Sequence, residues 1–383
     1  MNSKSHFTWI DFLRGISAFG IVLYHVRVDL WVGWVAISTQ PESFSFFDRA
    51  VALLSIPIPF LRPSVMLFFL VSGFCIHYSY AALSRSWELK SYSIRRFLRI
   101  YPPYIAAVVL CVLIEWILRV QFNQDVSPTG KVWQTVFMVQ NYSADKGQMY
   151  TNPALWSLPV EVELYVVYPI FYWLLRRYGI KWSMFTAAVV SIGALVISLG
   201  PNLQNYNNTL VQYGSHFAVY WIIWCAGALL AEWTKQDKLP KWQPWWWGVM
   251  ALTLVMGIAV TLLKLLIVIQ ELIWGGFYFT VMLWGMTQTD PLGFLSTRMK
   301  KLFSFLGLIS YSLYLINYPL FRLVGEIWIS LFGTKPANFL IPLLFSVLCI
   351  PLAYAFYLAV EAPSHKLARK LANPGRSPST VQS

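Results

Sequence analysis

The chain has 383 residues, of which 57% are hydrophobic, 17% are aromatic and only 12% are charged. Because a soluble domain carries about 25% charged residues, this composition excludes an ordinary soluble globular protein. The formal net charge of +13 could point to a nucleic-acid partner, and the distribution of the basic residues along the chain decides this point.

Long apolar segments recur from one end of the chain to the other. Each has roughly 17 to 25 residues, which is enough to cross the hydrocarbon core of a bilayer as an α-helix. The pattern predicts an all-α integral membrane protein, a bundle of about ten transmembrane helices. These are expected at residues 8–30, 64–84, 97–119, 160–178, 182–200, 215–233, 245–267, 270–288, 303–324 and 338–360.

The basic residues gather between alternate spans. If the N-terminus is cytoplasmic, the segments on the same side of the membrane hold clusters of Lys and Arg at 85–99, 176–181, 235–241, 298–301 and 366–376. The opposite loops hold only Arg49, Arg62, Lys131, Lys146 and Lys335. This asymmetry follows the positive-inside rule, which places both termini in the cytoplasm and explains most of the charge without nucleic acid. We therefore predict a multi-pass protein of the cell membrane, inner or plasma.

One transmembrane domain is expected over residues 1–372. The tail at 373–383, "NPGRSPSTVQS", has almost no apolar residues and is expected to be disordered. The four cysteines all fall in predicted spans and have neither C-x-x-C nor His-Cys spacing, so no metal site is expected. The first apolar segment is too long, and too polar on one face, for a cleavable signal peptide.

The first span contains "DFLRGISAFGIVLYH", with three ionisable residues that are costly to place in hydrocarbon. Asp11 and Arg14 are three residues apart, so they share a helix face and can pair. Arg14 and His25 share that face about three turns, or ~16 Å, apart along the axis. Such a polar stripe is a candidate functional site by default, although a structural ion pair and a hydrogen-bonded histidine would also explain it. Asp29 either orients the imidazole of His25 or is a solvated carboxylate at the interface.

The second span contains "FFLVSGFCIHYSY", in which Gly73 beside Ser72 allows another helix backbone to approach closely. The third span follows a cytoplasmic cluster of three arginines, in "SYSIRRFLRIYPPY": Arg95, Arg96 and Arg99. These arginines either anchor the helix by the positive-inside rule or form a phosphate-binding patch, since arginine forks match the geometry of phosphate.

The loop before the fourth span contains the apolar piece "VWQTVFMVQNY", which is too short to span and is expected to be interfacial or re-entrant. The fourth span opens with "LWSLPVEVELYVVYP". Glu161 and Glu163 point to nearly opposite sides of a helix, so at most one faces an interior site. Glu161 is favoured because it shares a face with Ser157 and Tyr165. It is expected near the outer surface at the depth of His25, and a histidine beside a carboxylate suits general-base chemistry on a hydroxyl.

Six motifs in a fixed order resemble the membrane acyltransferase-3 family. They are "IDFLRGI" with the Arg14-x10-His25 spacing, "FFLVSGF" at 68–74, "RRFLRIYPPY" at 95–104, "WSLPVEVELY" at 156–165, "SYSLYLINYP" at 310–319 and "VEAP" at 360–363. Each motif is weak alone, but together they cover nearly the whole chain.

The resemblance implies a ten-helix membrane enzyme that moves an acyl group, usually acetyl, from cytosolic acyl-coenzyme A to an extracytoplasmic acceptor. Acceptors in the family include sugar hydroxyls of O-antigens, peptidoglycan and exopolysaccharides. It marks Arg14 and His25 as essential, with His25 as the catalytic base, and also points to the arginines of 95–99 and to Glu161. Many members have histidine where Asn317 stands, so no catalytic role is carried over to Asn317. Some members append a hydrolase-like domain that passes the acyl group on. Because the sequence stops soon after its last predicted span, this chain is expected to complete the transfer itself or with a separate partner.

We therefore predict a membrane-embedded O-acyltransferase of the cell envelope, with acyl-coenzyme A (acetyl-CoA) as co-substrate and no metal. Residues expected to bind the donor are Asp11, Arg14, Ser72, Arg95, Arg96, Arg99 and Tyr165. His25, supported by Glu161, is expected to take a proton from a hydroxyl of a glycan or lipid-linked sugar. The sequence leaves open whether His25 acts as a base or is itself acylated, and it predicts no oligomeric state.

Two other functions could use the same residues. A transporter or flippase for a lipid-linked glycan could use the polar stripe as a path, but the inverted repeats and paired broken helices of such proteins are not evident. A non-catalytic scaffold for glycan assembly would leave the ordered Arg, His and Glu positions unexplained.

Overall fold

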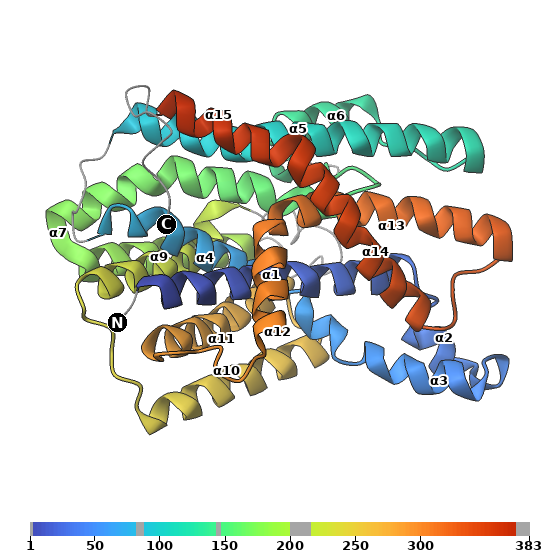
Figure 1. Ribbon diagram of the computed structural model, residues 1–383, viewed down its shortest axis with the longest axis horizontal. Coiled ribbons are helices and arrows are strands. Elements are labelled where there is room, and N and C mark those ends of the chain that lie inside the picture. The colour runs from blue at the N-terminus through green and yellow to red at the C-terminus, as the bar shows by residue number, and fades with distance from the viewer. Residues whose placement is uncertain (1–2, 82–87, 143–146, 200–215, 373–383) are drawn as a thin grey trace.

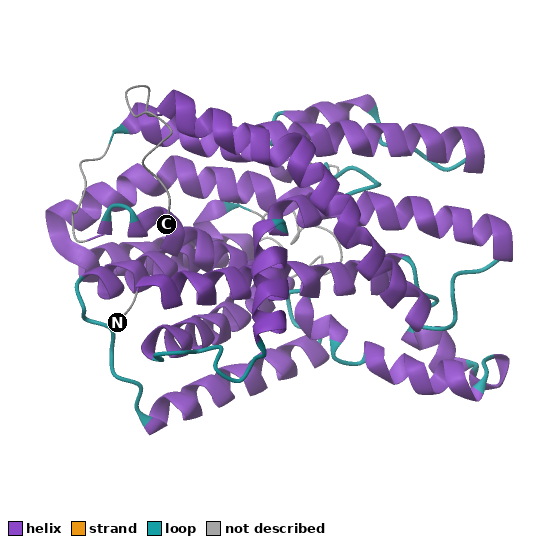
Figure 2. Cartoon of the chain, viewed as in Figure 1, coloured by secondary structure: helices purple, strands orange, loops and turns teal. Residues whose placement is uncertain are grey.

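The computed structural model describes residues 3–81, 88–142, 147–199 and 216–372. Within these ranges the regular elements are all helices, with no strand (Figure 2). Eight helical stretches in the described chain are long and apolar enough to cross a membrane, or nine if two helices joined at a 42° bend form one span. The predicted all-α membrane fold is therefore confirmed. The predicted tail at 373–383 lies outside the described residues.

The helices that build the bundle are arranged around α1 (Figure 1). Their bounds are α1 Ser3–Asp29, α4 Ser64–Tyr78, α5 Leu89–Phe122, α7 Ser157–Leu199, α9 Phe217–Lys235, α10 Pro244–Leu262, α11 Ile267–Thr287, α12 Thr297–Leu308, α13 Ser310–Phe332, α14 Leu340–Phe356 and α15 Ala362–Ala372. Shorter helices are α2 Trp34–Thr39, α3 Phe46–Ala52 and α6 Thr129–Val136. Since α1 packs against α4, α11, α12, α13 and α14, its polar residues are placed in the interior.

One predicted boundary differs from the observed one. The spans expected at 160–178 and 182–200 are two helical segments within α7, separated as predicted by a break at Gly179, where φ is 79° and ψ is 173°. The span expected at 303–324 is wrong at its start, because α12 ends at Leu308 and a separate helix, α13, begins at Ser310. Helix α12 packs closely on α1 just before the break, since a Cβ added to Gly307 would lie 2.3 Å from the carbonyl oxygen of Asp11.

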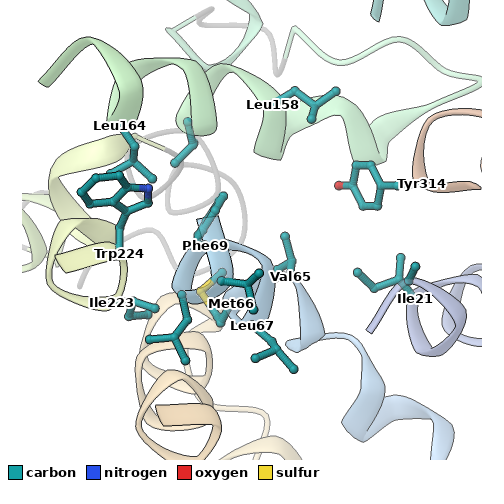
Figure 3. Packing of buried hydrophobic residues seen from close by; sticks show 14 of the residues in the cluster. Ile21, Val65, Met66, Leu67, Phe69, Leu158, Leu164, Ile223, Trp224 and Tyr314 are labelled. Atoms are coloured by element: carbon teal, nitrogen blue, oxygen red, sulfur yellow. The ribbon is translucent and has the colours of Figure 1, made fainter. Parts of the chain in front are cut away.

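Helices α4 and α9 cross at backbone contact. A Cβ added to Gly73 would lie 1.9 Å from the carbonyl oxygen of Trp224, and one added to Gly227 would lie 1.9 Å from that of Leu70. The close approach predicted at Gly73 is confirmed, because only residues without a side chain fit on both sides of this crossing. The residues packed around the crossing include Met66, Leu67, Phe69, Leu164, Ile223 and Trp224 (Figure 3).

The segment after α5, which is expected to be interfacial or re-entrant, folds back alongside α5, and we call it the re-entrant segment. Beyond Phe122 the chain turns back, and α6 lies alongside α5 (Figure 1). The hydroxyl of Tyr104 donates to the carbonyl of Thr135 at 2.7 Å, and that of Tyr101 donates to the carbonyl of Val136 at 3.2 Å. Tyr104 is about five turns, or ~27 Å, from the end of α5. The tyrosines supply the backbone partners that a segment at such depth requires.

Glu115 of α5 fastens the two ends of this re-entrant segment. Its buried carboxylate accepts hydrogen bonds from the amide and hydroxyl of Ser127, at 2.9 and 2.6 Å. It also accepts from the hydroxyl and amide of Thr151, at 2.9 and 3.2 Å. Four hydrogen-bond donors offset the cost of burying this carboxylate. The two ends of the re-entrant segment are therefore held at a fixed position on α5.

Candidate active site

A cavity lies where α1, α4, α5, α7 and α13 converge. We call it the inner cavity. Its lining includes six of the nine residues predicted for the site: Arg14, Ser72, Arg96, Arg99, Glu161 and Tyr165. Residues more than 290 positions apart in the chain meet here, since the Nη2 of Arg14 donates to the hydroxyl of Ser310 at 3.0 Å.

The inner cavity is rich in positive charge. Three guanidinium groups line it, from Arg14, Arg96 and Arg99, against one carboxylate, from Glu161. Among the described residues no carboxylate lies within 4 Å of these three arginines. Arg96 lies over the rings of Tyr92 and Tyr165, at 5.8 and 5.7 Å from their centroids, and its buried Nε has no hydrogen-bond partner. An excess of buried cations is costly by itself, so the cavity is electrostatically suited to an anion.

Two predicted donor-binding residues do not line this cavity. The expected ion pair between Asp11 and Arg14 is not formed, because the Arg14 side chain extends to Ser310 of α13 instead. Arg95 is half-buried on α5 and is also absent from the lining. The arginines at 96 and 99, which are three residues apart, both reach the cavity because they share a face of α5.

Glu161 lies on the inner cavity and not beside His25. Its carboxylate accepts hydrogen bonds from the hydroxyl of Ser72, at 3.3 Å, and from the hydroxyl of Tyr165. The expected match in depth with His25 is wrong because the re-entrant segment carries the chain inward before α7 begins. Ahead of α7, the fully buried Asn152 donates to the carbonyl of Leu315 at 2.9 Å. Helix α7 therefore starts inside the bundle.

A second, smaller cavity contains His25. We call it the outer cavity, and it is lined by Ile21, Tyr24, His25, Arg62, Val65, Ala154, Trp156, Glu271 and Tyr314. Two of these residues, Val65 of α4 and Tyr314 of α13, also line the inner cavity. Figure 3 shows Val65 and Tyr314 together with Ile21 of α1, from the three helices that meet there. The two cavities are thus neighbours with a shared wall of two side chains.

Asn317 fixes the orientation and tautomer of the His25 imidazole. The side-chain amide of Asn317 donates to the carbonyls of Leu313 and Tyr314, at 2.8 and 2.9 Å, which assigns its nitrogen. Its oxygen therefore faces Nδ1 of His25, at 2.7 Å, and accepts the Nδ1–H. The other ring nitrogen, Nε2, is left with its lone pair and can accept a proton.

Helix α13 contacts both Arg14 and His25 of α1. Ser310, at its start, contacts Arg14, and Asn317, seven residues further, contacts His25. Seven residues correspond to two turns, or ~10 Å, so the same faces of α1 and α13 meet along this distance. The polar stripe of the first span is therefore matched by a polar stripe on α13, and it connects the inner cavity with the outer one.

The family model for the acyltransferase domain matches residues 7–358. The chain belongs to this acyltransferase family. Curated relatives include Nodulation protein 10 of Rhizobium leguminosarum bv. viciae, 24% identical over 68% of this chain and 69% of that protein. The O-acetyltransferase OatA of Staphylococcus aureus (strain NCTC 8325 / PS 47) is 23% identical over 96% of this chain. The alignment spans only 58% of OatA. No solved structure matches the chain.

Sequence reasoning assigned no role to three polar residues of this acyltransferase that lie at the outer cavity. Asn317 contacts His25 directly, while Arg62 and Glu271 line the cavity wall. Glu271 could have been selected from the sequence, since an acidic residue within an apolar span is a functional candidate by default. Asp29 neither orients His25 nor is solvated, because it is buried and pairs with Arg322 at 3.2 Å.

The described part of this acyltransferase holds no group of three or more His, Cys, Asp or Glu residues placed to bind a metal ion. The cysteines are free thiols. The polar side chains that line the two cavities include arginines, hydroxyls, the carboxylates of Glu161 and Glu271, and one histidine, His25.

Proposed function

We propose that this acyltransferase moves an acyl group, acetyl in the simplest case, from cytosolic acyl-coenzyme A to a hydroxyl of an extracytoplasmic glycan. The observation that carries the proposal is the shared wall between a cationic cavity and a cavity with an oriented histidine. The relative OatA is named as an O-acetyltransferase, which supports transfer to oxygen. The inner or plasma membrane, with both termini in the cytoplasm, is the proposed location.

The donor occupies the inner cavity in this proposal. Coenzyme A is a polyanion, and the excess of guanidinium groups at Arg14, Arg96 and Arg99 would bind its phosphates by charge-assisted hydrogen bonds. The thioester end would extend along the polar stripe to the wall formed by Val65 and Tyr314. Ser72, Glu161 and Tyr165 line the same cavity and would position the donor.

The acceptor hydroxyl enters the outer cavity and meets Nε2 of His25. Its oxygen attacks the thioester carbonyl carbon while Nε2 takes the hydroxyl proton. The tetrahedral intermediate then collapses, the carbon–sulfur bond breaks, and the proton passes from the imidazolium to the departing thiolate. The products are an ester and the free thiol of coenzyme A. The oxygen of Asn317 stabilises the imidazolium through the Nδ1–H during the reaction.

The role of His25 is tested with His25→Ala in a strain whose own gene is deleted. We expect the ester content of surface glycans, measured by mass spectrometry, to fall to the level of the deletion strain. His216→Ala is the matched control, because His216 lines neither cavity. Wild-type ester content in His25→Ala cells would remove His25 from the mechanism.

The donor site is tested by coenzyme A binding to the purified protein. Arg99→Ala is expected to weaken binding about tenfold or more, because a charge-assisted hydrogen bond is worth about 1.5–3 kcal/mol. Arg177→Ala removes an equal charge from an exposed position outside both cavities, so it should leave binding unchanged. An equal loss of coenzyme A affinity in the two variants would mean that the arginines act only through long-range electrostatic attraction to the ligand.

A further inference from the structure

The outer cavity holds a pair of ionisable side chains that the proposed transfer does not use. Nη2 of Arg62 lies 3.3 Å from Oε1 of Glu271, and the hydroxyl of Tyr220 donates to Oε2 of Glu271 at 2.5 Å. Glu271 belongs to α11 and is 1% exposed, whereas the Arg62 side chain, just after residues 58–61, is 28% exposed. Both residues line the same cavity as His25.

Stability alone is a poor explanation for this pair. A buried ion pair gains little over apolar residues of the same size, because desolvation offsets the attraction between the charges. An acidic residue in the middle of the apolar sequence "IVIQELIWGG" is costly to bury and points to a ligand. Its place, in the wall of the cavity where Nε2 of His25 must meet a hydroxyl, identifies the ligand as the acceptor.

The charges of the outer cavity indicate which acceptor fits. Arg62 and Glu271 neutralise each other, so the cavity has no excess charge, in contrast to the inner cavity with three arginines and one glutamate. An anionic sugar would find no free cation there. An uncharged sugar would find both an acceptor and a donor, because the carboxylate and the guanidinium each keep hydrogen-bonding capacity beyond their mutual contact.

The remaining lining agrees with a single sugar ring. Trp156 lines the cavity together with Tyr24 and offers a flat apolar surface to the C–H face of a sugar. A few placed polar groups beside aromatic rings are typical of sites that bind and orient one small ligand.

We propose that Arg62, Glu271 and Trp156 form an acceptor subsite for one uncharged sugar ring of the glycan. Arg62 and Glu271 bind neighbouring hydroxyls of this ring, and Trp156 covers its apolar face, so that another hydroxyl is presented to His25. This inference rests on the proposed function, since it takes the outer cavity as the acceptor side.

The test uses the full chain in nanodiscs and measures sugar binding directly, by saturation-transfer NMR titration with the methyl glycosides of uncharged hexoses and with methyl glucuronide. The wild type is expected to bind at least one uncharged glycoside more tightly than the glucuronide. Glu271→Gln should weaken the uncharged glycoside about tenfold and improve the glucuronide, because Arg62 then carries an unneutralised charge. A merely structural role for Glu271 would not reverse this preference.

A second variant separates binding from folding. Arg62→Met combined with Glu271→Leu replaces the pair by apolar residues of similar size, so the fold should survive and coenzyme A binding should stay within about twofold of the wild type. Sugar binding should be lost. A double variant that binds the glycosides like the wild type would overturn the proposal, as would tighter binding of the glucuronide by the wild type. If the wild type binds the sugar but transfers nothing from acetyl-coenzyme A, the subsite stands and the proposed function fails.

Discussion

Replacing Asn317 by leucine tests how far the activity depends on the orientation of His25. The oxygen of Asn317 lies 2.7 Å from Nδ1 of His25, and both side chains are buried, at 0% and 7% exposed. Leucine has a similar volume and no acceptor. The variant would therefore leave the Nδ1–H without its partner in a dry site, and the neutral ring would be free to exchange its tautomer and to place the proton on the reacting nitrogen.

The magnitude follows from the hydrogen bond. Leaving a buried donor unsatisfied costs about 1–3 kcal/mol, and every 1.36 kcal/mol is about tenfold in rate. We therefore expect kcat of Asn317→Leu to fall by about 5- to 150-fold. The KM for acyl-coenzyme A should change little, because Asn317 does not line the inner cavity.

The assay is release of coenzyme A thiol by the purified protein in nanodiscs at saturating donor and acceptor. Asn317→Gln is the matched control, because its amide keeps an oxygen to accept from Nδ1–H and a nitrogen to donate to the carbonyls of Leu313 and Tyr314. It should retain most of the activity. If Asn317→Leu kept kcat within twofold of the wild type, the imidazole would not depend on this contact and the assignment of Nε2 as the base would lose its support.

Two predictions concern the fold. Glu115→Ala removes the acceptor of four hydrogen bonds in the re-entrant segment, so the free energy of unfolding should fall by at least about 3 kcal/mol. The loss is measured as a lower Tm in detergent, with the exposed Glu42→Ala as the control. Equal Tm values for the two variants would contradict the prediction. Gly73→Ala places a methyl group 1.9 Å from the carbonyl oxygen of Trp224 and should abolish the monodisperse peak in size-exclusion chromatography. Gly193→Ala, with nothing within 4 Å, should leave that peak unchanged, and an intact peak for Gly73→Ala would refute the tight crossing.

The sequence by itself determined the class of the protein and most of its inner cavity. Hydropathy is a local property, so runs of apolar residues predict spanning helices without knowledge of their neighbours. The spacing of residues on one helix is equally local. It placed Arg14 on the same stripe as His25, and both residues meet polar side chains of α13. It did not separate Arg96 and Arg99, which line the inner cavity, from Arg95, which does not.

Only the tertiary structure decided which side chains meet across helices. Contacts between helices depend on the depth at which each helix starts, and that depth depends on loops with little pattern of their own. The re-entrant segment carries α7 inward, so Glu161 meets Ser72 and Tyr165 rather than His25. Asn317 becomes the partner of His25 because the break before α13 sets the register of that helix against α1.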